Sequence, residues 1–136
     1  MKIKFIIALL IGGLQCLSTS ATAAPKCSLK TLKGTYLYSA NGTKDGIPYA
    51  ESGQEYYDGN GKITSTYTDN TGYTGKSGGV YTLGENCIGV AHYMSGESFA
   101  MYVDPKGSEF SWIAESRKYN YALTGFEKRV TTTELK

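Results

Sequence analysis

The feature that most constrains the fold is a series of short runs rich in Tyr, Thr and Val, each ended by Gly, Asn, Asp or Pro. Polarity tends to alternate along these runs, and no window keeps the apolar spacing of an amphipathic helix. We therefore predict an all-β chain with eight strands, at residues 34–41, 49–57, 62–70, 79–83, 87–94, 98–103, 108–115 and 119–129.

Most of these runs are joined by recognisable turn sequences. Asp58-Gly59-Asn60-Gly61 supplies residues that tolerate positive φ, and Asp104-Pro105-Lys106-Gly107 places Pro and Gly where a β-turn uses them. The segments 84–86 and 95–97 serve two further corners. We expect longer connections only at 41–48 and 71–78.

Tight turns between successive strands imply sequential antiparallel pairing. A flat meander of eight strands would leave two long edges and one wet face, whereas a closed barrel removes the edges. We therefore predict a single meander closed into a small barrel, with a β-sandwich as the alternative. Side chains can just fill an eight-stranded barrel, or it can hold one small ligand.

The segment 1–23 has the pattern of a signal peptide. Two lysines precede an apolar run at 5–14, and Ala21-Thr22-Ala23 supplies the small-x-small pattern that signal peptidase reads. The run is too short to span a bilayer. A lipid anchor on Cys16 is the alternative, which the bulky amide of Gln15 just before it disfavours. We therefore predict cleavage after Ala23 and export to the periplasm or the medium.

Cleavage there would leave one β-barrel domain at 24–129 and a loose tail at 130–136. The remaining chain carries equal numbers of acidic and basic residues. It therefore lacks the positive charge that nucleic acid or an anionic membrane surface would attract. We expect no nucleic-acid partner and no stable membrane insertion.

Cleavage would also leave two cysteines, Cys27 and Cys87. In an exported protein such a pair most often forms one disulfide. The alternatives are two buried free thiols or a nucleophilic cysteine, which would need His92, the chain's only histidine, as its base. One histidine and no cysteine cluster lead us to predict no metal site, no cofactor and no assigned catalytic residue.

Gly34-Thr35-Tyr36, at the head of the first predicted strand, and Arg129, at the end of the last, form a further pattern. It resembles the calycin arrangement of lipocalins, in which G-x-W opens the barrel and a late Arg stacks over the aromatic ring. Tyr36 stands where that family has Trp. The resemblance implies a lipocalin-like barrel in which Gly34, Tyr36 and Arg129 form the closure.

A second pattern spans most of the processed chain. It consists of Cys27, Leu32-x-Gly34-x-Tyr36, Asp58-Gly59-x-Gly61, Gly79-x-Tyr81 and Cys87-x-Gly89. It resembles a group of small secreted bacterial proteins of unknown function. The resemblance implies one barrel-like domain with a structural disulfide, and it implies no activity.

Tyrosine is in marked excess, with 12 in the chain. In the run 62–70, Tyr67 lies on the face opposite the threonines, so we expect it to point inward. The same alternation directs Tyr57, Tyr81 and Trp112 inward. Each offers a flat apolar face and one hydrogen-bonding group, so we predict that these four line a site for a small amphipathic molecule. The alternative is that they are simply strand-favouring residues.

Three classes of function follow from this pattern. The first is a carrier with its site at the barrel mouth, and the second is a protein-interaction module or inhibitor that uses its outer surface or the connection 71–78. The third is an enzyme without a strong nucleophile, for which Glu51, Glu55 and Glu115 are the acids to test. An open interior would favour the carrier, and a filled interior would favour the interaction module.

Overall fold

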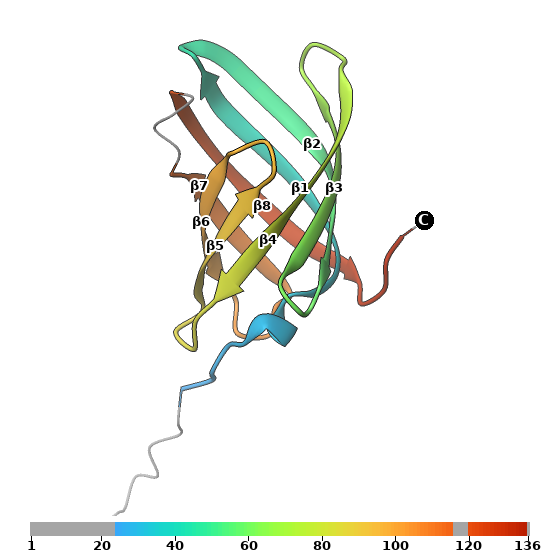
Figure 1. The fold of residues 1–136 in the computed structure, drawn as a ribbon, viewed down its shortest axis with the longest axis vertical. Coiled ribbons are helices and arrows are strands. Elements are labelled where there is room, and N and C mark those ends of the chain that lie inside the picture. Colours follow the sequence, from blue (N-terminus) through green and yellow to red (C-terminus); the bar gives the residue numbers. More distant parts are fainter. Residues whose placement is uncertain (1–23, 116–119, 136) are drawn as a thin grey trace, which may run out of the picture.

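The computed structural model describes residues 24–115 and 120–135. A short 3-10 helix precedes eight strands: η1 (Leu29–Thr31), β1 (Lys33–Lys44), β2 (Ile47–Asp58), β3 (Lys62–Asp69), β4 (Thr74–Leu83), β5 (Ile88–Tyr93), β6 (Ser98–Val103), β7 (Glu109–Ala114) and β8 (Tyr121–Thr131). Each strand pairs antiparallel with the next, and β8 pairs with β1, so the sheet closes into a barrel (Figure 1). The predicted meander barrel is confirmed. The predicted signal peptide lies outside the described residues.

The two long connections predicted from the sequence are wrong. β1 and β2 remain paired as far as Lys44 and Ile47, and the two residues between them, Asp45 and Gly46, have φ of 54° and 78°. A two-residue turn with positive φ at both positions matches the twist of the strands, so it suits a long hairpin. The glycine-rich segment belongs to β4, which begins at Thr74.

One half of the barrel interior is filled by aromatic side chains. Tyr36, Tyr57 and Phe110 meet edge to face, with ring centroids 5.3, 5.3 and 5.6 Å apart. Tyr81 packs on Tyr57 in the same way at 5.2 Å. This geometry is the one that aromatic quadrupoles favour, and all four side chains are buried. The end of the barrel nearest η1 is therefore a packed core.

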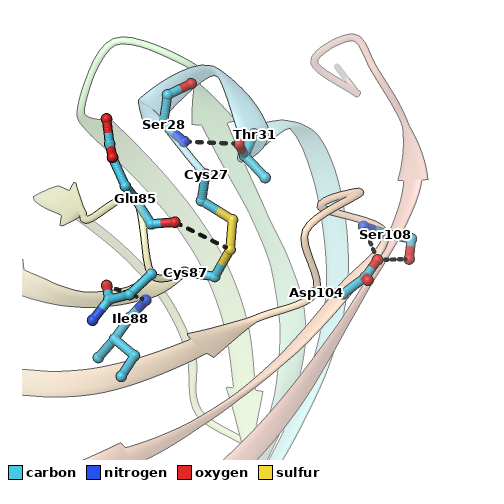
Figure 2. The surroundings of a disulfide bond; sticks show 9 residues. Cys27, Ser28, Thr31, Glu85, Cys87, Ile88, Asp104 and Ser108 are labelled. Carbon is cyan, nitrogen blue, oxygen red and sulfur yellow. Dashed lines mark hydrogen bonds between the residues drawn. A yellow bond between two sulfur atoms is a disulfide. The ribbon is translucent and has the colours of Figure 1, made fainter. Parts of the chain in front are cut away.

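A disulfide between Cys27 and Cys87 staples η1 to this closed end (Figure 2). The two Cα atoms lie 5.0 Å apart, and the bridge joins the segment before η1 to the residue before β5. The Cys27 amide also donates to the Glu85 carbonyl at 3.1 Å, and Lys26 forms an ion pair with the Glu85 carboxylate. The chain is thus held to the β4–β5 connection by both covalent and polar contacts.

Arg129 closes the same end of the barrel in a different way from the expected stacking. It lies opposite Tyr36 in the β1–β8 register. Its guanidinium donates to the carbonyls of Lys33 at 3.4 Å and Lys106 at 3.1 Å, and the Tyr36 hydroxyl donates to the Gly107 carbonyl at 2.5 Å. The arginine therefore ties β1 to the β6–β7 connection through backbone carbonyls. Lys44, not Arg129, is the cation that lies over aromatic rings among the described residues.

Gly34 has a steric role in this closure. Its φ is 130°, and a Cβ atom there would lie 2.1 Å from the Thr131 carbonyl oxygen. β8 therefore passes β1 too closely for any residue with a side chain.

Candidate ligand-binding cavity

The half of the barrel opposite η1 encloses a cavity of about 320 Å³. All eight strands contribute to its lining. Its aromatic walls are formed by Tyr38, Tyr49, Tyr57, Tyr67, Tyr93, Phe99, Trp112 and Tyr121. The mouth lies at the end that carries the β1–β2 and β5–β6 connections, because Lys44, Ser95 and Glu97 line the cavity there.

The space exists because several inward positions carry small residues. Ala91 is buried and lines the cavity without filling it. Gly75 and Gly125 accept aromatic rings: a Cβ at Gly75 would lie 2.6 Å from Cζ of Tyr67, and one at Gly125 would lie 2.3 Å from Cζ2 of Trp112. These glycines let the rings lie back against the wall, which leaves the middle of the barrel open.

Two buried glutamates form the floor of the cavity. Glu55 on β2 is 5% exposed and Glu127 on β8 is 2% exposed. The Tyr57 hydroxyl donates to Glu55 Oε2 at 2.7 Å and lies 3.4 Å from Glu127 Oε1, so it links the two carboxyls. The Tyr93 hydroxyl donates to Glu55 Oε1 at 2.5 Å. Glu127 Oε2 is buried and has no hydrogen-bond partner among the described residues.

Burial raises the pKa of both floor glutamates, because a charged carboxylate loses its hydration there. The pKa of Glu127 lies well above its ordinary value, and the neighbouring charge of Glu55 raises it further. The hydroxyls of Tyr93 and Tyr57 oppose the rise in the pKa of Glu55, since they donate to its ionised form. The pair therefore holds a proton at a pH at which free glutamates have lost theirs.

A second polar group lies between the floor and the mouth. Glu51 accepts hydrogen bonds from the Tyr38 hydroxyl at 3.1 Å and the Tyr49 hydroxyl at 2.7 Å. At the mouth, the Lys44 ammonium lies 5.0 Å from the ring centroids of both Tyr49 and Tyr121. The cavity thus combines aromatic walls with ionisable groups at three depths.

The structure places the four predicted ligand-binding residues inside the barrel but at different heights. Three of them line the cavity: Tyr57, Tyr67 and Trp112. Tyr81 does not, because it lies at the closed end, where its hydroxyl donates to the carbonyls of Leu29 at 2.8 Å and Leu32 at 3.1 Å. Alternation along a strand identifies the face of a residue but not its height in the barrel.

The three acids named from the sequence do not all lie in the cavity. Glu51 and Glu55 line the cavity, whereas Glu115 is exposed beyond the end of β7. The sequence reasoning missed Glu127. Alternation in β8 could have found it, since Leu123 and Glu127 share the inward face and both are buried.

The described residues show neither a metal-binding cluster nor a membrane-spanning helix. No group of three or more His, Cys, Asp or Glu within 24–115 and 120–135 is placed to hold a metal ion. In that same part of the chain, no helix has the length and apolar character needed to cross a membrane.

No protein-family model matches the chain, and no curated protein is similar to it in sequence. Among solved structures, it is similar to a designed protein described as "De novo design of a fluorescence-activating beta barrel". The TM-score is 0.54 and the sequence identity is 11%, over 76% of this chain and 98% of the designed one. At this identity the likeness shows a common fold, a small closed β-barrel.

Proposed function

We propose that the protein binds and carries a small amphipathic molecule in the barrel cavity. The observation that carries the proposal is an aromatic-walled space of about 320 Å³ above a buried acidic floor with an unpartnered oxygen among the described residues. The walls suit the flat apolar body of a ligand, and the floor suits its polar group.

Empty space and unpartnered polar atoms are both rare in protein interiors, and among the described residues this cavity has both. Interiors are close-packed and contain few voids larger than a water molecule. Buried polar atoms almost always have a hydrogen-bond partner, so an orphan such as Glu127 Oε2 calls for one. A bound molecule that fills the space and donates to this oxygen would meet both requirements.

A thermal-shift screen of lipids, aromatic compounds and small metabolites tests the proposal. A ligand at a hundredfold excess over its Kd should stabilise the fold by about 2.7 kcal/mol. Emission from Trp112, the only tryptophan in the chain, should respond, because its indole lines the cavity.

Two variants on β5 form a matched pair for this screen. Ala91→Phe adds a ring inside the cavity, whereas His92→Phe adds the same ring on the outer face. We expect the first to abolish ligand stabilisation and the second to preserve it. Equal responses of both variants to a ligand, or no stabilising compound in the whole screen, would contradict the proposal.

A second candidate function is general acid catalysis on the bound molecule. It is favoured by the raised pKa of Glu55 and Glu127 inside the cavity, because a carboxyl that keeps its proton above the ordinary range can act as an acid. Mass spectrometry of a ligand after incubation with the protein separates the two candidates. An altered ligand would support catalysis, and an unchanged ligand would support carriage.

We also propose that the protein acts after export. The support is the predicted signal peptide at 1–23 together with the Cys27–Cys87 disulfide, since such bonds persist in oxidising compartments. Cell fractionation followed by immunoblotting would test this, and recovery of the processed chain from the cytoplasm would contradict it.

A further inference from the structure

We propose that the ligand is a protonated amine on an apolar or aromatic body, with its ammonium group bound between Glu55 and Glu127. This inference rests on the proposed carrier function and specifies the chemical class of the molecule carried.

The two acids of the cavity floor have no basic partner among the described residues. Buried carboxyls are costly unless a cation or a full set of donors compensates them. Lys26 and Glu85 form the only ion pair among the described residues, and it lies on the outer surface. Neither floor glutamate has a basic partner there. The two carboxyls hydrogen-bond to each other, so one of them keeps a proton, and Glu127 Oε2 has no donor among the other described side chains.

The hydrogen-bond donor that Glu127 Oε2 lacks can be described by its chemistry. Tyr57 and Tyr93 already donate to Glu55, so the free acceptor lies on Glu127. An ammonium group has three donors and one positive charge, so it can bond to Glu127 Oε2 and also interact with Glu55. A ligand carboxylate at this depth would instead meet two acids.

Aromatic rings form the cavity wall just above the two floor glutamates. Phe99 packs edge to face on Trp112 at 4.7 Å and on Tyr93 at 5.7 Å, and all three rings line the cavity. Aromatic faces attract ammonium groups. Lys44 shows the same chemistry at the mouth, where its ammonium lies over two tyrosine rings.

The charge of the whole cavity points the same way. Its lining contains four acidic side chains and two basic ones, and the acidic ones are Glu51, Glu55, Glu97 and Glu127. Lys44 is one of the two basic residues, and it lies at the mouth rather than the floor. The acidic side chains of the lining outnumber the basic ones, so a cationic ligand also suits the composition of the cavity.

Binding of the amine should release a proton. The floor pair holds a proton before binding, and a cation between the two carboxyls favours the doubly ionised pair. The titratable groups that face the pair are the hydroxyls of Tyr57 on β2, Tyr93 on β5 and Tyr38 on β1. Burial raises the pKa of all three hydroxyls, so they keep their protons, and the released proton comes from the carboxyl pair.

Three probes of equal length test the proposal: 4-phenylbutylamine, 4-phenylbutanol and 4-phenylbutyrate. Isothermal titration calorimetry with the processed chain should show the amine binding at least tenfold more tightly than the alcohol or the carboxylate. Titrations in phosphate and in Tris at one pH should report proton release for the amine alone.

Glu127→Gln should weaken amine binding at least tenfold, change alcohol binding by less than threefold and reduce the proton release. Glu109→Gln, which makes the same substitution at an exposed position on β7, should change none of these values.

The outcomes separate the two proposals. If the alcohol or the carboxylate binds as tightly as the amine, and Ala91→Phe blocks it, the amine assignment is wrong and the carrier function stands. If all three probes fail to bind while the wider screen finds a cavity ligand, the amine assignment again fails alone. If neither the probes nor the screen gives a ligand sensitive to Ala91→Phe, both proposals fail.

Discussion

Replacing Glu127 with glutamine should make the free protein more stable at neutral pH, and the gain should grow as the pH rises. The pKa of both floor glutamates is raised in the folded state by burial, whereas in the unfolded chain a glutamate titrates near pH 4.3. Above that pH the folded protein holds a proton that the unfolded chain has lost. The contribution of this pair to stability is therefore greatest at low pH and falls as the pH rises toward the folded-state pKa.

The magnitude follows from the number of protons. Each proton held only by the folded state lowers the free energy of unfolding by about 1.4 kcal/mol per pH unit. The loss continues until the pH reaches the folded-state pKa of the pair. Glutamine at position 127 keeps the volume of the side chain and removes one titrating group, so the variant should hold one proton fewer than the wild type. Its advantage should be near zero at pH 4 and should grow above pH 5 by up to about 1.4 kcal/mol per pH unit.

Urea unfolding followed by circular dichroism between pH 4 and pH 7.5 measures this difference. Surface carboxyls act oppositely, since hydrogen bonds from Thr71 and Ser108 lower the pKa of Asp69 and Asp104, and their contribution is lost as the pH falls. These groups are the same in both proteins, so they cancel in the comparison. A Glu127→Gln variant that is less stable than the wild type at pH 7, or whose difference does not change with pH, would show that the floor pair does not hold a buried proton.

The exposed variant Glu109→Gln supplies the control. It removes one negative charge from the outer face of β7, where the side chain stays in water. Its stability relative to the wild type should stay within about 0.5 kcal/mol over the same pH range. If the stability difference between Glu109→Gln and the wild type changed with pH as steeply as that of Glu127→Gln, net charge rather than burial would explain the effect.

Three further outcomes are expected. Reduction of the bridge between Cys27 and Cys87, which are 60 residues apart, should lower the free energy of unfolding by about 4 kcal/mol without loss of the β signal in circular dichroism; two alkylatable thiols in the native, unreduced protein would disprove the bridge. Gly125→Ala should displace the indole of Trp112, shift its emission and cost about 1–3 kcal/mol, and an unchanged spectrum would contradict this packing. The intact mass of the exported protein should correspond to a chain that begins at Ala24, whereas a lipidated mass would contradict cleavage by signal peptidase.

The strand order and most turns could be predicted because they depend on local chemistry. Gly59 and Gly61 have φ of 79° and 104°, in line with a turn sequence that predicts such residues. The wrong prediction at the β1–β2 connection also concerns local chemistry. Asp45-Gly46 is a strong hairpin signal, and it lies inside the segment that was expected to be a long loop.

The candidate site was predictable only in part. Alternation placed Tyr57, Tyr67 and Trp112 inward, and the structure puts all three in the cavity lining. The same alternation placed Tyr81 inward, yet Tyr81 packs beneath η1. Arg129 lies beside Tyr36, but its guanidinium donates to loop carbonyls at the closed end rather than lying over an aromatic ring.

A strand has a period of two residues whatever its surroundings, so the sequence alone assigns each side chain to the interior or the exterior. The height of each side chain along the barrel depends on the assembled fold. Tyr57 and Glu127 are 70 residues apart and belong to different hairpins, and they meet because β8 closes onto β1 with a particular register. Closure and register arise from pairing between distant segments, so the acidic floor and the open space above it are properties of the assembled barrel.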